Sequence, residues 1–326
     1  MPGLADKRLV FVTGKGGVGK STVAIALGIA AARQGLRTIV AELSGQARAA
    51  ELFGVAPPSG EEARLAAGLH AISVDMEQAM EEYLHERAGR VGDLLAASRA
   101  FHTFAHATPG MRELLSIGKV WELAQDRRRV AGAQPYDLVI VDAPATGHAV
   151  GALRAPATFA EIARVGPIAY QGRTIDATLR DPAQTAVVAV ALPEEMPVTE
   201  TLALRDRLRD ALGQEPAAVV VNACLPERIG PRQAKTLADA LDAAEDRVVH
   251  AALRAALSEQ ARACTQREQV ARLAAGLDGR TPLELPYLFP GGPASAGHVA
   301  GSGTPSADAL DASALGNLAE HVEALL

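Results

Sequence analysis

The chain has 326 residues, of which 48% are hydrophobic, and it carries a formal net charge of -6. This hydrophobic share is sufficient for a large buried core, whereas the acidic balance argues against general affinity for nucleic acid, which needs clustered cations. Its two cysteines, Cys224 and Cys264, lie far apart, so the sequence indicates neither a disulfide framework nor a cysteine-rich zinc site.

The N-terminal region combines a strand, a glycine-rich loop and a helix. Residues 8–12 form a short apolar run that predicts a buried strand, and residues 22–33 have the apolar face of a helix. No signal-peptide pattern is present, and the apolar run of residues 23–32 is too short to span a bilayer. We therefore expect a soluble, cytoplasmic protein.

The loop between this strand and this helix has the sequence GKGGVGKST and begins at Gly14. Lys20 completes the pattern G-x-x-x-x-G-K-[ST], whose backbone N–H groups cradle nucleotide phosphates. The helix that follows favours anions, because its free N–H groups and its dipole both point at the phosphate. The pattern predicts a nucleotide-binding site, and a glycine-rich turn without a ligand is the weaker alternative.

Lys15 is a second lysine in this loop, and the ordinary pattern does not require it. Only 5 of the 32 lysines and arginines in the chain are lysines, and two of them lie in these nine residues. A compact ammonium group fits between phosphate oxygens where a planar guanidinium would not. Lysine at both positions therefore supports phosphate binding.

Strand and helix patterns alternate along the rest of the chain. Apolar runs predict further strands at residues 38–42, 69–74, 138–141, 185–192, 217–221 and 283–285. Helical periodicity predicts helices at residues 76–129, 158–180, 199–212 and 232–277. Unbroken apolar runs are typical of parallel strands covered on both faces. The sequence therefore predicts an α/β fold, with a doubly wound, mostly parallel sheet and an inserted helical subdomain.

The domain organisation follows from this pattern. We expect a discontinuous P-loop domain at residues 1–75 and 135–289, and a helical subdomain at residues 76–134 plus about 158–180. Within the latter, residues 126–129 (DRRR) predict a solvated helix end, where cations suit the helix dipole. The composition of residues 290–308 predicts a flexible linker. A terminal helix follows at residues 309–326; it most simply docks on its own domain, and binding to a partner is the alternative.

An acidic residue, Asp142, ends the apolar strand that includes Val141. In a P-loop protein this position faces the Mg²⁺ shell or the attacking water, although a helix-capping aspartate is the alternative. Residues 145–148 are small and polar, which suggests a loop that rearranges around a γ-phosphate. His148 is then a credible residue of such a switch.

These motifs together resemble a known family. The loop GKGGVGKST resembles the deviant Walker A motif of the MinD/ParA/arsenite-pump class of P-loop ATPases. The string DAPATGH resembles the DTAPTGH signature of one branch, the arsenite-pump (ArsA) and tail-anchored-protein-targeting ATPases. Similar segments recur near Val74, at residues 111–123, and near Leu192 and Val219, so the resemblance covers roughly residues 8–288.

The resemblance implies an ATPase with ATP and Mg²⁺ as cofactors. The loop residues that it assigns to nucleotide binding are Gly14, Gly16, Gly17, Val18, Gly19, Lys20, Ser21 and Thr22. Ser21 would ligate Mg²⁺ and Thr22 would contact the α-phosphate. Asp142 would orient the Mg²⁺ shell.

The resemblance also implies a dimer and a base-binding residue. Lys15 would be the signature lysine that reaches the partner's phosphates across a nucleotide-sandwich dimer. Gly147 and His148 would belong to a second switch. Asn222 would hydrogen-bond the adenine edge, with an asparagine that merely ends a strand as the alternative.

One departure from the family concerns hydrolysis. Family members carry an aspartate after the second strand that positions the attacking water, and an ungapped alignment places Ser44 there. A serine cannot act as a carboxylate base near neutral pH. Glu42 or Gln46 could orient the water instead, as glutamine does in other NTPases. We therefore hypothesise a weaker or differently regulated ATPase.

Partners and clients are less well defined by the sequence. We expect a homodimer, or a heterodimer with a related ATPase. A hydrophobic protein segment or a membrane partner could be the client, although the methionines of the inserted helices are few. Arsenite is disfavoured, because two scattered cysteines cannot supply three thiolates. The alternatives are a nucleotide-gated binding module with little hydrolysis, a MinD/ParA-like positioning ATPase, and a P-loop small-molecule kinase.

Overall fold

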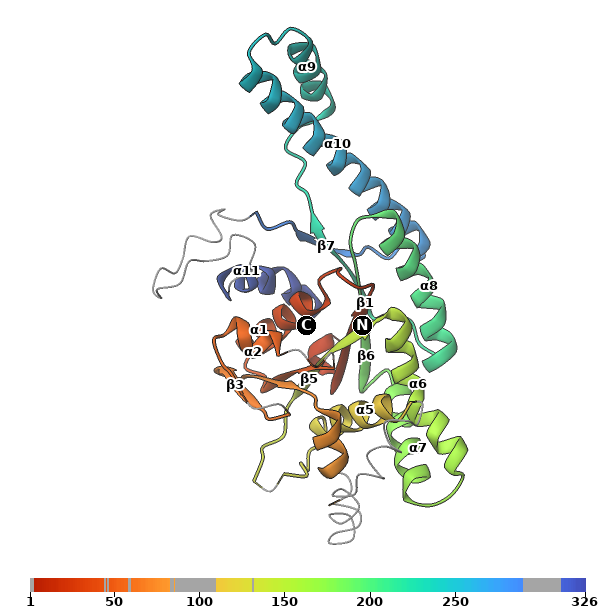
Figure 1. Ribbon diagram of the computed structural model, residues 1–326. Helices are drawn as coiled ribbons and strands as arrows, with labels where there is room; N and C mark the ends of the chain where they lie inside the picture. Colours follow the sequence, from red (N-terminus) through yellow and green to blue (C-terminus); the bar gives the residue numbers. More distant parts are fainter. Residues whose placement is uncertain are drawn as a thin grey trace.

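The computed structural model describes residues 3–43, 45, 47–57, 60–82, 85, 110–130, 132–289 and 312–326 (Figure 1). The strands are β1 (Leu9–Gly14), β2 (Thr38–Glu42), β3 (Ala63–Ala66), β4 (Leu69–Ser73), β5 (Leu138–Ala145), β6 (Thr185–Ala191), β7 (Ala218–Cys224) and β8 (Leu283–Pro286). The α-helices are α1 (Lys20–Arg33), α2 (Arg48–Leu52), α5 (Met111–Leu123), α6 (Thr146–Ala163), α7 (Pro167–Arg180), α8 (Glu195–Leu212), α9 (Pro231–Asp242), α10 (Arg247–Gly276) and α11 (Ala312–Val322). Among these residues, no helix combines the length and the apolar character that crossing a membrane requires.

The strands form one eight-stranded sheet in the order β3-β4-β2-β5-β1-β6-β7-β8. Neighbouring strands are parallel except for β3 and β4. β1 is central, with Leu9 opposite Val139 of β5 and Thr185 of β6. This topology confirms the predicted α/β fold with a mostly parallel sheet, as in P-loop NTPases.

β3 is an edge strand that the sequence pattern does not reveal. It pairs with β4 in antiparallel orientation, and Arg64 and Ala66 are exposed. An edge strand with one open face needs no continuous apolar run, so its sequence resembles that of a loop.

Side chains alternate along the central strand and build a core on each face of the sheet. Leu9 and Phe11 pack on the face that α5, α6, α7, α8 and α10 cover. Val10 and Val12 pack on the face that α1 and α11 cover. Burial on both faces explains why the parallel strands are unbroken apolar runs.

The helices α5, α6 and α7 form a group at one end of the sheet (Figure 1). α5 packs against α6 and α6 against α7, while Nε1 of Trp121 donates a hydrogen bond to Oγ1 of Thr178 at 3.1 Å. Together with residues 76–82, which are also helical, these helices include most of the described part of the segments assigned to a helical subdomain. Residues 83, 84, 86–109 and 131 of those segments lie outside the described residues. The helices α5, α6 and α7 all follow or precede β5, the strand that carries Asp142.

The segment after Asp142 is helical, where the sequence suggested a flexible loop. β5 continues through Ala145, and α6 begins at the next residue, Thr146. The loop expectation for residues 145–148 is therefore wrong. Residues 146–148 (TGH) are weak helix formers, so tertiary packing decides where α6 begins. The first turns of α6 bury Ala149, Ala152 and Leu153.

The predicted helix at residues 232–277 is in fact two helices, α9 and α10. They separate at residues 243–246, where the side chain of Asp246 accepts hydrogen bonds from the N–H groups of Val248 and Val249 at 2.7 and 3.0 Å. This cap satisfies free donors at the start of α10. Figure 1 shows α9 and the first part of α10 projecting away from the sheet.

The terminal helix α11 packs against α1 on one face of the sheet. Leu315, Leu318 and Val322 are buried there, and Nη1 of Arg33 donates a hydrogen bond to the carbonyl of Gly316 at 3.1 Å. The predicted linker at residues 290–308 lies outside the described residues.

A group of charged side chains is buried where the chain leaves α5 and passes the edge strand β3. The side chain of Arg128 is 1% exposed and forms ion pairs with Glu122 at 3.0 Å and with Glu62. Oη of Tyr136 donates a hydrogen bond to Glu62 at 2.7 Å. The solvated helix end predicted at residues 126–129 is therefore wrong for Arg128, because two carboxylates neutralise its charge. These four residues are called the Arg128 cluster below.

Candidate functional site

The glycine-rich loop lies at the carboxyl edge of the sheet, between β1 and α1. β1 ends at Gly14, and Gly19 precedes α1 with a φ of 91°. A Cβ at Gly19 would lie 2.2 Å from Nδ2 of Asn222, and a Cβ at Gly14 would lie 2.1 Å from the carbonyl oxygen of Val190. Both positions therefore require glycine.

The residues predicted to bind phosphates follow one another along this loop and the first turn of α1. Val18 is 1% exposed and packs into the core beneath the loop, whereas Gly16 and Gly17 are exposed. The structure thus brings together Gly14, Gly16, Gly17, Val18, Gly19, Lys20, Ser21 and Thr22. The buried side chain of Val18 therefore anchors the loop, while the backbone at Gly16 and Gly17 is accessible to a ligand.

Asn222 connects β7 to this loop. Its Nδ2 donates a hydrogen bond to the carbonyl oxygen of Val18 at 3.0 Å. The next residue, Ala223, has a φ of 60°, which is uncommon for a residue with a side chain. Asn222 therefore supports the loop from β7, which β6 separates from β1. Its contact with adenine stays a prediction.

Lys20 lies in the first turn of α1, and its Nζ donates a hydrogen bond to the carbonyl oxygen of Lys15 at 3.2 Å. Burial lowers the pKa of Lys20, the charge of Asp142 opposes this shift, and the charge of Arg48 adds to it. A phosphate at this position would supply the negative charge that favours the ammonium form.

Ser21 and Asp142 are in direct contact. Oγ of Ser21 donates a hydrogen bond to Oδ2 of Asp142 at 2.5 Å. Asp142 is 3% exposed, and its Oδ1 is buried without a hydrogen-bond partner in the described part of the chain. Burial raises the pKa of Asp142, while the Ser21 hydroxyl and the charges of Lys20 and Arg48 oppose the rise.

The donors at this point suit Mg²⁺, which prefers oxygen ligands. The hydroxyl of Ser21 donates to Oδ2 of Asp142, and the other oxygen of the same carboxylate, Oδ1, has no partner among the described residues. Within the described ranges, no three His, Cys, Asp or Glu side chains gather into a metal site. Mg²⁺ is commonly held by one or two carboxylates together with substrate phosphates and waters, so a single acid beside a loop serine is sufficient.

Glu42 is the second buried carboxylate at this edge. It is 1% exposed and lies opposite Asp142 in the β2–β5 register. Both of its carboxylate oxygens lie 3.3 Å from the N–H donor of Ala49 in α2. Burial raises the pKa of Glu42 to about 7, the N–H of Ala49 opposes this, and the Asp142 charge adds to it. Ser44 and Gln46 lie outside the described residues.

Lys15 has a partner within its own chain, because its Nζ lies 3.1 Å from Oε1 of Glu200 on α8. Both side chains are about one-third exposed. No sequence pattern predicts this pair, because the two residues are far apart in the chain. Gly147 and His148 are exposed in the first turn of α6, and their assignment to a switch stays a prediction.

Comparison with known families agrees with this geometry. A family model described as anion-transporting ATPase matches residues 7–168 and 162–248, which include the loop, Asp142 and Asn222. The chain belongs to the anion-transporting ATPase family. This confirms the resemblance to arsenite-pump and tail-anchored-protein-targeting ATPases at the level of the family.

Individual relatives of this chain agree with the family match. ATPase BagA of Mycobacterium tuberculosis is 32% identical over 263 residues, which cover 78% of this chain and 74% of the relative. A putative arsenical pump-driving ATPase of Halobacterium salinarum is 29% identical over 238 residues, 69% of this chain and 37% of that protein. ATPase GET3 of Kluyveromyces lactis is 30% identical over 182 residues, 49% of this chain and 51% of that protein. All three are named as ATPases.

A cavity of about 400 Å³ lies where β6, β7 and β8 of this ATPase-family chain end. Leu192, Ala223, Tyr287 and Phe289 are among its lining residues. The rings of Tyr287 and Phe289 meet edge to face, with centroids 4.9 Å apart. This volume is typical of ligand sites, which span about 300–1,000 Å³. Two aromatic residues so close together in a chain with only 3% aromatics were a signal that the sequence offered.

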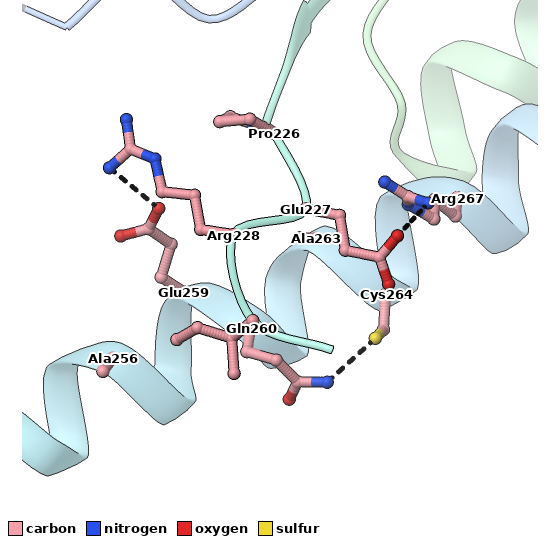
Figure 2. A pocket seen from close by; sticks show the side chains of 10 residues that line it. Pro226, Glu227, Arg228, Ala256, Glu259, Gln260, Ala263, Cys264 and Arg267 are labelled. Carbon is pink, nitrogen blue, oxygen red and sulfur yellow. Dashed lines mark hydrogen bonds and ion pairs between the residues drawn. The ribbon is translucent and has the colours of Figure 1, made fainter. Parts of the chain in front are cut away.

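A smaller cavity, of about 70 Å³, lies between the segment after β7 and α10 (Figure 2). Arg228 pairs with Glu259 at 3.5 Å, and Arg267 pairs with Glu227 at 2.6 Å. Figure 2 shows these pairs joining the segment to the helix. Because each charged group forms an ion pair that joins the segment to the helix, we interpret this cavity as part of the attachment of α10.

Proposed function

We propose that this chain binds ATP with Mg²⁺ at the glycine-rich loop, hydrolyses it, and does so as a dimer. The observation that carries the proposal is the contact between Ser21 and Asp142 beside Lys20. It places a hydroxyl, a carboxylate with one unpartnered oxygen and an ammonium group at the N-terminus of α1. Phosphates and a divalent cation satisfy all three groups at once.

Each residue has a distinct task in this proposal. The backbone of the loop and the dipole of α1 bind the phosphates, and Lys20 neutralises part of their charge. Ser21 and Asp142 would hold Mg²⁺, which when bound offsets the negative charge of the phosphate oxygens. Asn222 keeps the loop in position through its bond to Val18.

The base of the nucleotide is proposed to lie toward the cavity at the ends of β6, β7 and β8. Ala223 lines this cavity and adjoins Asn222, the residue expected to bind the adenine edge. Tyr287 and Phe289 offer an apolar wall of the kind that a planar base contacts. The phosphate and base regions would then lie on the two sides of Asn222.

Dimer formation would change the contacts of Lys15. In the single chain its ammonium pairs with Glu200. In a closed dimer we propose that it leaves Glu200 and binds the phosphates in the partner, so that closure and hydrolysis are linked. The partner would be a second copy or a related ATPase.

The client of the ATPase would be handled by the helices that follow β5. α6 begins directly after the strand of Asp142, so a change at the phosphates reaches α6 without an intervening loop. Ile162, Val165 and Tyr170 are exposed near the turn between α6 and α7. A hydrophobic protein segment or a membrane partner fits such side chains better than arsenite does, since both cysteines are single and unbridged.

A second candidate function is a nucleotide-gated binding module that turns over very slowly. Glu42 favours it, because both carboxylate oxygens face the N–H donor of Ala49. A carboxylate used in this way is not free to orient a water. Tight ATP binding with negligible phosphate release would select this candidate.

The proposal is tested with wild type and Lys20→Ala, with Lys235→Ala on the exposed part of α9 as the matched control. Calorimetry with ATP and Mg²⁺, phosphate release and molar mass in solution are measured for each. We expect Lys20→Ala to reduce phosphate release by at least about 100-fold, because it removes a fixed positive charge at the transferring phosphate. We also expect the molar mass of wild type and of the control, but not that of Lys20→Ala, to increase when ATP is added.

Three results are decisive. Wild type that does not bind ATP would overturn the proposal, and so would Lys20→Ala that binds and hydrolyses ATP like wild type while retaining the native circular dichroism spectrum. A molar mass that does not respond to ATP would remove the dimer from the proposal and leave the nucleotide site.

A further inference from the structure

Arg48, the first residue of α2, has no role in the site described so far. The contacts that hold α2 nevertheless belong to that site. The N–H of Ala49, the next residue, faces both carboxylate oxygens of Glu42 at 3.3 Å. Glu42 lies opposite Asp142 in the sheet, and Asp142 accepts the hydroxyl of Ser21. Three successive contacts thus connect the backbone beside Arg48 to the start of α1.

The direction of the strands adds to this placement. β1, β2 and β5 are parallel, so their carboxyl ends meet at one edge of the sheet. The glycine-rich loop leaves this edge from β1, and the segment that leads to α2 leaves it from β2. Arg48 therefore returns to the edge where the phosphates of a nucleotide would lie. It is exposed and so accessible to a ligand.

The charge of Arg48 acts on the ionisable groups of this edge. It lowers the pKa of Lys20, and it opposes the rise in pKa of both Glu42 and Asp142. These effects agree with a guanidinium that is close to all three groups. In the described ranges, no ion pair joins Arg48 to a carboxylate.

The guanidinium group of Arg48 is chemically suited to bind a phosphate. The partly buried Lys20 and the exposed Arg48 bring two positive charges to one edge. The carboxyl groups of Glu42 and Asp142 offset them only in part, because burial shifts both toward their neutral forms. A guanidinium presents a rigid fork of donors that binds two phosphate oxygens at once. A nucleoside triphosphate carries oxygens on a terminal phosphate that the diphosphate lacks, so a cation at this position can distinguish the two.

We propose that Arg48 binds the terminal phosphate of a nucleoside triphosphate from within the same chain. The inference rests on the proposed function, since it assigns one more residue to the same phosphate site. It also differs from that proposal in one respect: Lys15 would act on the partner subunit, whereas Arg48 supplies charge without a partner. An arginine that stabilises the terminal phosphate in cis promotes hydrolysis in other NTPases.

The competing explanation is that Arg48 only helps α2 to fold. The contacts of α2 argue for a separable test, because Glu42 is bound by the backbone of Ala49 and not by the Arg48 side chain. Truncating the side chain therefore leaves this anchor in place. A structural role would affect ATP and ADP equally, whereas a bond to the terminal phosphate would affect ATP alone.

The experiment compares wild type, Arg48→Ala, Arg48→Lys and the control Arg254→Ala, an exposed arginine of α10. The dissociation constants of ATP and of ADP are measured with Mg²⁺ on the full chain, together with phosphate release. We expect Arg48→Ala to weaken ATP binding about tenfold and ADP binding by less than about twofold. Arg48→Lys should lie between wild type and Arg48→Ala, and the control should match wild type.

The outcomes separate this inference from the proposed function. If wild type binds ATP and Arg48→Ala keeps the same ratio of ATP to ADP affinity, the inference on Arg48 is wrong and the proposed function stands. If wild type binds neither nucleotide, both are wrong. Should Arg48→Ala lose its native circular dichroism spectrum, the ratio of ATP to ADP affinity is measured for Arg48→Gln, because glutamine keeps the Cβ and Cγ methylenes and a polar end but lacks the charge.

Discussion

The edge of the sheet where we propose that phosphates bind and the Arg128 cluster both bury ionisable side chains, yet burial has opposite consequences for their charge. Lys20, Glu42 and Asp142 lie at that edge, which is called the phosphate edge below. At the phosphate edge, burial raises the pKa of Glu42 and Asp142 and lowers that of Lys20, so each group is shifted toward its neutral form. In the Arg128 cluster, burial alone would raise the pKa of Glu62, but hydrogen bonds from Arg128 and Tyr136 lower it.

The difference lies in the supply of partners. Burial alone would lower the pKa of Arg128, but Glu62 and Glu122 raise it, so the ion pairs of that cluster stay charged. At the phosphate edge, Oδ1 of Asp142 has no hydrogen-bond partner among the described residues. Nη1 of Arg128 and Oε2 of Glu122 also lack a hydrogen-bond partner among these residues, so the two places differ in charge and not in the number of hydrogen bonds. Buried groups that stay charged because they form ion pairs indicate a structural role, whereas buried groups that are shifted toward their neutral forms indicate a site for a charged ligand.

The largest expected effect comes from breaking the ion pairs of the Arg128 cluster. Arg128→Met removes the cation from Glu62 and leaves Glu122 with the more distant ammonium of Lys119, at 3.8 Å. We therefore expect the free energy of unfolding to fall by about 3–5 kcal/mol. Urea unfolding followed by circular dichroism measures this loss. Arg127→Met, at the exposed neighbour, is the control and should lie within about 0.5 kcal/mol of wild type. Equal stability of the two variants would contradict the interpretation of the cluster.

A smaller effect is expected at the phosphate edge, and it depends on pH. The pKa of Glu42 is raised from an ordinary value of 4.5 to about 7, so the folded state binds this proton more tightly than the unfolded state. Its contribution to stability is complete below about pH 4.5 and is lost as the pH rises through about 7. We expect wild type to lose about 2 kcal/mol of stability between about pH 5.5 and about pH 8 relative to Glu42→Gln.

The measurement for Glu42 is urea unfolding at about pH 5.5 and about pH 8. Glutamine can still accept the hydrogen bond of Ala49, so the variant removes the titration and keeps the anchor. Glu61→Gln, at an exposed residue, is the control and should follow wild type. A Glu42→Gln protein with the same pH slope as wild type would show that Glu42 is not held protonated by burial.

The smallest expected effect is the loss of one hydrogen bond within the Arg128 cluster. Tyr136→Phe removes the hydroxyl that donates to Glu62 and keeps the ring between Arg37 and Arg128. We expect a loss of about 1.5 kcal/mol in the free energy of unfolding, typical of a hydrogen bond to a charged group. The dissociation constant for ATP should not change. A change in ATP affinity would mean that the Arg128 cluster and the phosphate edge are energetically coupled, which would contradict a purely structural role for the cluster.

Much of this contrast could not be predicted from the sequence. The phosphate loop, β2, β6 and Asp142 follow from local patterns, because strand runs and the loop motif involve neighbouring residues. Arg128 lies in a run of cations that is typical of a surface, and only its contacts with Glu62 and Glu122 bury it. The pairing of Lys15 with Glu200 depends on how α8 packs, for which the sequence has no periodic signal.

Because α6 begins directly after β5, a small rotation at the end of β5 moves the far end of α6 by a larger distance. α6 has 18 residues, and at 1.5 Å per residue it is about 27 Å long. A tilt of about 5° at its first turn, a few residues from Asp142, would move its far end by about 2 Å. Pro156 lies inside α6, so the far end moves by this full amount only while the helix stays straight through that residue. Under the proposed function, a small movement at the phosphates would then become a shift of about 2 Å at the α6–α7 turn, where Ile162 and Val165 are exposed.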